Sequence, residues 1–88
     1  MFFIYLKRDE KFLDIKISLG NVADVKSFVN SVSKFGCEVD LVSGRYIVDG
    51  RSIMGIFSLD LSKPINANIR ACADEKSFLT EIERLIAE

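Results

Sequence analysis

The 88-residue chain has no histidine, one proline, two cysteines and a formal net charge of −1. The absence of histidine excludes imidazole general bases, imidazole metal ligands and phosphohistidine. Basic residues are scattered along the chain, so there is no electrostatic basis for binding nucleic acid or an anionic membrane. The sequence therefore predicts no metal site, no cofactor and no nucleic-acid or membrane partner.

Long apolar runs are also missing. The run that starts at Phe2 ends at Lys7, and no basic residue precedes it. A run of this length is too short for a membrane span or for the apolar region of a signal peptide. We therefore expect a cytoplasmic protein.

The two cysteines form no C-x-x-C pattern. Strand alternation puts Cys37 in phase with the apolar residues Val39 and Leu41, which are expected to point inward. Cys72 is out of phase with the alternating apolar set that runs from Ile65 to Ala71. Side chains on opposite faces of a sheet cannot be bridged, so the pattern predicts two free thiols.

The remaining polar residues do not form a catalytic arrangement. Adjacent acidic pairs fall in expected turns or helix caps, where solvated charge is far commoner than acid–base catalysis. The serines and cysteines lack a candidate base, and the five glycines do not form a phosphate-binding loop. We expect a protein that is not an enzyme.

Hydrophobic periodicity predicts one α+β domain over residues 1–88. Long amphipathic helices are expected to begin after the N-cap residues Asn21 and Asp74. Strands are expected at residues 12–19, 38–43, 46–49 and 65–71. Residues 2–7 are also β-prone, and they fit either a hairpin with the next strand or one long bent strand.

A short segment that begins at Ser52 stands out, because it lies between two strands and is rich in apolar residues. Ser52 occupies the N-cap position of a short helix. Such a helix cannot bury every side, and contiguous exposed apolar surface often marks a docking site. We expect Ile56 and Leu59 to turn inward, and Ile53, Met54 and Phe57 to form an exposed patch. Gly55 indicates a close approach either of a partner or of the underlying sheet.

The order of elements and the run Arg51-Ser-Ile-Met-Gly-Ile-Phe-Ser-Leu59 resemble the bacterial histidine-containing phosphocarrier family, HPr, of the phosphoenolpyruvate:sugar phosphotransferase system. The match runs without gaps from about Val29 to about Ile69. It implies an open-faced two-layer sandwich, with an antiparallel sheet of four strands covered on one face by helices. Residues 2–7 would add an extra N-terminal strand to this sheet if they form a hairpin. The match also implies that Ser52 is a regulatory phosphorylation site. The residues Arg51, Ile53, Met54 and Phe57 would then bind a serine kinase/phosphorylase and a transcriptional regulator.

The chain departs from the family at the carrier segment Gly-x-His-x-Arg-Pro. Counting back from Ser52 places the carrier histidine at Asn21, the arginine at Ala23 and the proline at Asp24. An asparagine amide has no nitrogen lone pair that can accept a phosphoryl group and pass it on. The resemblance therefore implies the catabolite-repression branch, whose members lack this histidine. The alternative is a diverged interaction or structural domain without phosphorylation, whose N-terminal strand serves another partner or self-association. The oligomeric state stays open.

Overall fold

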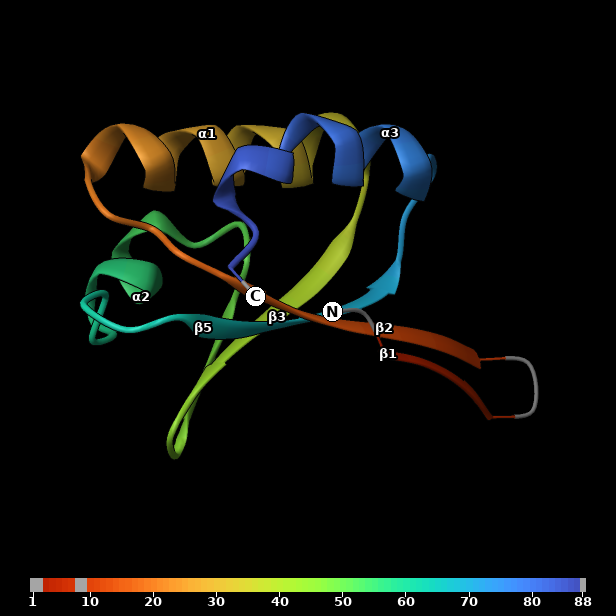
Figure 1. The fold of residues 1–88 in the computed structure, drawn as a ribbon, viewed down its shortest axis with the longest axis horizontal. Coiled ribbons are helices and arrows are strands. Elements are labelled where there is room, and N and C mark those ends of the chain that lie inside the picture. The colour runs from red at the N-terminus through yellow and green to blue at the C-terminus, as the bar shows by residue number, and fades with distance from the viewer. Residues whose placement is uncertain (1–2, 8–9, 88) are drawn as a thin grey trace.

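A computed structural model of the chain describes residues 3–7 and 10–87, and the side chains of residues 13–87. One antiparallel sheet carries helices on one face, as Figure 1 shows. The strands are β1 (Phe3–Lys7), β2 (Glu10–Ile17), β3 (Glu38–Ser43), β4 (Tyr46–Asp49) and β5 (Ile65–Ala71). The helices are α1 (Val22–Lys34), α2 (Ile53–Phe57) and α3 (Glu75–Glu81), and a 3₁₀ turn η1 covers Glu83–Leu85.

The sheet has five strands in the order β1-β2-β5-β3-β4. β1 pairs antiparallel with β2, from Phe3 opposite Asp14 to Lys7 opposite Glu10. The hairpin expectation is therefore confirmed, and the single bent strand is not what forms; the turn itself lies outside the described residues. The strand order puts β1 at one edge of the sheet and β4 at the other. In Figure 1, strands β1 and β2 extend past the helices.

The core lies between the sheet and the helices. α1 contributes Val25, Phe28 and Val32, all fully buried, and α3 contributes Phe78, whose ring centroid lies 6.2 Å from that of Phe28. The strands bury alternate residues, for example Leu13, Ile15 and Ile17 on β2. The residues between them face the opposite side of the sheet, which is solvated, as expected for an antiparallel sheet with one covered face.

The helix ends follow the capping pattern that the sequence predicts. Asn21, Ser52 and Asp74 are N-caps, and each accepts a backbone N–H three residues further along its helix. Gly36 follows α1 at φ +60°, a conformation in which glycine is favoured. The last helix is shorter than its apolar stripe indicates, because α3 ends at Glu81 and the chain continues as η1.

The two cysteines form a disulfide, so the expectation of free thiols is wrong. The reason is a shift of register between β3 and β5. Glu38 pairs with Ala71 but Val39 pairs with Ile69, which leaves Arg70 as an extra residue on β5. Such a bulge reverses the alternation beyond it and brings Cys72 to the side of the buried Cys37. The bond joins the residue that precedes β3 to the residue that follows β5.

Deleting residues 1–7 should lower the thermal midpoint of unfolding. β2 would become an edge strand and would lose the backbone pairing that β1 provides. A domain of this size loses about 4–8 °C for each kcal/mol of stability. Circular dichroism melting of the full and truncated chains measures the change in midpoint. Light scattering shows whether the exposed edge of β2 changes the oligomeric state. An unchanged melting curve and mass would show that β1 contributes nothing to this fold.

Candidate functional site

The segment around Ser52 is fixed to the sheet by a turn that follows β4. The Ser52 N–H donates to the Asp49 carbonyl at 3.0 Å, and the Gly50 N–H donates to the Val39 carbonyl at 2.8 Å. A Cβ atom at Gly50 would lie 3.0 Å from the Val39 Cβ, so only glycine allows this close approach to β3 without a shift. The turn thus sets where α2 begins.

Ser52 is half-buried and caps α2 with its side chain. Its hydroxyl oxygen accepts the Gly55 N–H at 3.1 Å. A Cβ atom at Gly55 would lie 2.9 Å from that oxygen and 3.3 Å from the Val48 Cβ. Gly55 therefore leaves room for the Ser52 cap and for β4. Of the two close approaches that the sequence allows, to a partner or to the sheet, the structure shows the one to the sheet.

The apolar residues of α2 divide into two faces. Ile56 is fully buried and Leu59 nearly so, whereas Met54 is 81% exposed, Phe57 41% and Ile53 36%. The predicted orientation of all five is confirmed. An exposed fraction this large is unusual for methionine next to two further apolar residues, and such a group is typical of a docking surface. Its role in binding stays a prediction.

Arg51 is exposed beside Ser52, but it is engaged with Asp49. The Asp49 carboxylate accepts the Arg51 backbone N–H at 2.8 Å, and Nε of Arg51 lies 3.4 Å from the same oxygen. This backbone hydrogen bond, followed by the guanidinium, lowers the pKa of Asp49. Sequence reasoning did not find Asp49, although its spacing of two residues from Arg51 is the signal of such a turn.

At the N-terminus of α1, where the carrier segment is expected, the side-chain carboxylate of Asp24 is held by hydrogen bonds and an ion pair. The Asn21 side chain accepts the Asp24 N–H at 2.9 Å, and Asp24 accepts the Gly20 N–H at 3.1 Å. Asp24 also forms an ion pair with Arg84, with Nη1 2.8 Å from Oδ1. Arg84 is the first cause of the lowered pKa of Asp24. The sequence indicated the acidic cap but not Arg84, which is 60 residues away.

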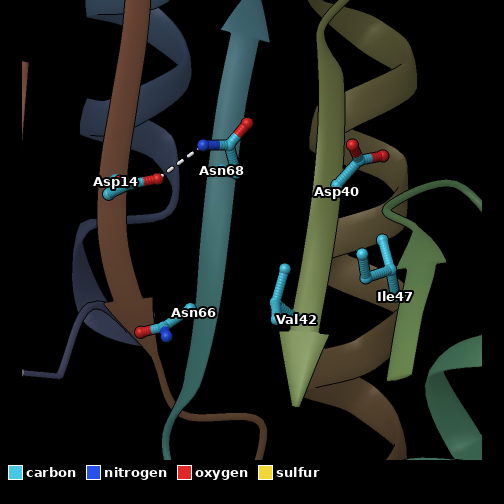
Figure 2. A pocket seen from close by; sticks show the side chains of 6 residues that line it. All are labelled: Asp14, Asp40, Val42, Ile47, Asn66 and Asn68. Atoms are coloured by element: carbon cyan, nitrogen blue, oxygen red, sulfur yellow. Dashed lines mark hydrogen bonds between the residues drawn. The ribbon is translucent and has the colours of Figure 1, made fainter. Parts of the chain in front are cut away.

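An open hollow of about 530 Å³ lies on the other face of the sheet. Figure 2 shows Asp14 of β2 and Asn68 of β5 side by side, joined by a hydrogen bond of 2.6 Å. Asp40 of β3 lies on the far side of Asn68, and it pairs with Arg70 at 3.5 Å. Val42 and Ile47 complete the apolar part of the lining. The hollow includes none of the site residues predicted from the sequence.

These elements define a class of protein: a small α+β domain with one open sheet face and a capped short helix beside its covered face. The family model described as "PTS HPr component phosphorylation site" matches residues 14–88. The chain belongs to the HPr family.

A crystal structure of HPr-C-His from Thermoanaerobacter tengcongensis is similar to most of this chain. It has 28% sequence identity and a TM-score of 0.59, over 89% of this chain and 90% of that chain. A comparison with curated protein sequences gives no match. Among the helices that the structure describes, none has the length and apolar character needed to cross a bilayer.

Proposed function

We propose that this HPr-family protein is a regulatory binding protein that acts through its Ser52 segment and does not carry phosphate on α1. Phosphorylation of Ser52 would switch its binding. In that step the Ser52 oxygen forms a bond to the γ-phosphorus of ATP, ADP leaves, and the hydroxyl proton passes to a base of the kinase. The partners are a serine kinase/phosphorylase and a regulator protein in the cytoplasm, and the protein itself is not an enzyme.

The observation that carries the proposal is that a helix-capping hydroxyl lies next to an exposed apolar patch. Ser52 lies at the start of α2, and Met54 and Phe57 project into solvent within the next five residues. A partner that contacts this patch would also meet Ser52 and any group attached to it. A phosphate adds about −1.5 to −2 charges and three acceptor oxygens, enough to change such an interface.

The carrier role is disfavoured by the residues at the start of α1. Asn21 uses its side-chain oxygen as the helix cap, and Asp24 places a carboxylate where an incoming phosphate would approach. Ala23 stands where the family has an arginine that helps to engage the transcriptional regulator. The regulator bound by this protein is therefore expected to use other contacts, chiefly those to Met54 and Phe57.

The second candidate is an interaction domain without phosphorylation. It is favoured by β1, which adds a further strand at an edge of the sheet. Edge strands present unpaired backbone groups that another strand can pair with. In this case Ser52 would be only a helix cap, and partner binding would be independent of its modification.

Incubation with ATP and the serine kinase of the family tests the proposal. One phosphoryl group is expected, on Ser52. The matched control is Ser52→Asn, because asparagine caps helices as well as serine does but offers no hydroxyl. Ser52→Ala removes both and should also cost about 1 kcal/mol of stability.

A pull-down with unmodified and phosphorylated protein then identifies partners that depend on the modification. Met54→Gln should weaken their capture without loss of stability, because the side chain is exposed. If the Ser52→Asn variant is still phosphorylated, or if partners are captured equally by the unmodified and phosphorylated proteins, the interaction domain without a role for Ser52 phosphorylation is favoured.

A further inference from the structure

The Arg51 side chain is held by the Asp49 carboxylate, and Arg51 directly precedes Ser52 in the chain. Nε of Arg51 lies 3.4 Å from Oδ1 of Asp49, and Nη2 lies 3.5 Å from Oδ2. The Arg51 and Asp49 side chains are 58% and 52% exposed. An ion pair with distances this long and so much solvent around it is weak. It can be exchanged for a stronger one.

The backbone keeps the three residues together in one turn. The Ser52 N–H donates to the carbonyl of Asp49, and the Arg51 N–H donates to its carboxylate. Arg51 therefore lies in one tight turn with Asp49, whose carboxylate it binds, and with Ser52, the next residue of the chain. A phosphoserine is a stronger ligand for a guanidinium than a carboxylate is, because it carries about −1.5 to −2 charges and has three acceptor oxygens.

We propose that Asp49 and phosphorylated Ser52 compete for Arg51, so that the guanidinium passes from the carboxylate to the phosphoserine on modification. The inference rests on the proposed function, since it needs phosphate on Ser52. Asp49 then determines how much of the phosphate charge Arg51 neutralises, and how much is left for a basic partner surface. Asp49 is thus a positioning residue that acts on the modified serine through Arg51.

The charged groups that face Asp49 determine how its pKa responds when Arg51 leaves. Asp49 lies opposite Asp40 in the β3–β4 register. Arg70 pairs with Asp40 and also lowers the pKa of Asp49, more weakly than Arg51 does. When Arg51 leaves, Asp49 keeps the Arg51 backbone N–H and faces Asp40 and Arg70. Phosphorylation should therefore raise the pKa of Asp49 towards its ordinary value.

The test uses the full chain with phosphoserine incorporated at position 52 during translation, so that no kinase is required. Phosphorus NMR titration gives the second pKa of the phosphoserine, which is ordinarily about 6. Arg51→Gln should raise that pKa, and Asp49→Asn should lower it, each by about 0.2–0.7. Asp60→Asn is the matched control, because the exposed Asp60 follows α2 but binds Ser62 instead of Arg51. It should change the pKa of the phosphoserine less than Asp49→Asn does.

The double variant Asp49→Asn/Arg51→Gln separates competition from direct repulsion. If the two residues act through one guanidinium, Asp49→Asn should have a smaller effect in the Arg51→Gln background than in the natural chain. Effects that add, or an Arg51→Gln variant whose phosphoserine pKa is unchanged, would overturn the inference. Failure of the kinase to label Ser52 would count against the proposed function but would leave this result as it stands.

Discussion

Incubated with phosphoenolpyruvate and the first enzyme of the phosphotransferase system, the protein should acquire no phosphoryl group. Asn21, which we assign to the carrier position, is an amide whose nitrogen lone pair is delocalised, and its oxygen already accepts the Asp24 N–H. The Asp24 carboxylate accepts the Gly20 N–H and pairs with Arg84, so it already occupies the helix end that would otherwise attract phosphate. Label is therefore expected to be at background, against one group per molecule for a histidine-containing family member.

Two variants locate the reason for this result. Asn21→His restores only the nucleophile, and we expect weak labelling because the Asp24 carboxylate still occupies the helix end and binds Arg84. Asn21→His combined with Asp24→Asn should be labelled more strongly, since the carboxylate is then removed and Arg84 is released from its ion pair. An acid-labile phosphoryl adduct on the natural chain would contradict the assignment of Asn21 to the carrier position.

Loss of the Cys37–Cys72 disulfide should lower the free energy of unfolding by about 2–4 kcal/mol. The bond closes a loop with a sequence separation of 35 residues, so it restricts the unfolded chain considerably. Urea unfolding with and without a reductant measures the effect. The double variant Cys37→Ala/Cys72→Ala serves as control, because a reductant should not change its midpoint.

The same bond bears on the compartment in which the protein works. Disulfides persist in oxidising compartments and are rare in the cytosol. If the protein is cytoplasmic, trapping of thiols during cell lysis should find both cysteines reduced, and the lower stability would apply there. Equal unfolding midpoints with and without the reductant would show that the bond contributes nothing to stability.

Most of the fold is predictable from the sequence because its signals are local. The three N-caps form hydrogen bonds to groups three residues away, and the alternation of β2 is visible in its sequence. The same holds for α2, where the spacing of Ile56 and Leu59 against Met54 and Phe57 predicts which residues are buried. Family resemblance added the hypothesis that Ser52 is phosphorylated, whereas periodicity by itself describes this residue only as a helix cap.

The sequence by itself determined the order of the elements, the capped helix ends, the exposed patch on α2 and the absence of a histidine nucleophile. Tertiary structure decided the disulfide, the pairing of Asp24 with Arg84 and the hollow between β2 and β4. The physical reason is the distance along the chain. Hydrogen bonds within a turn depend on neighbouring residues, whereas these contacts depend on how strands and helices register, and one extra residue at Arg70 was enough to move Cys72 to the other face.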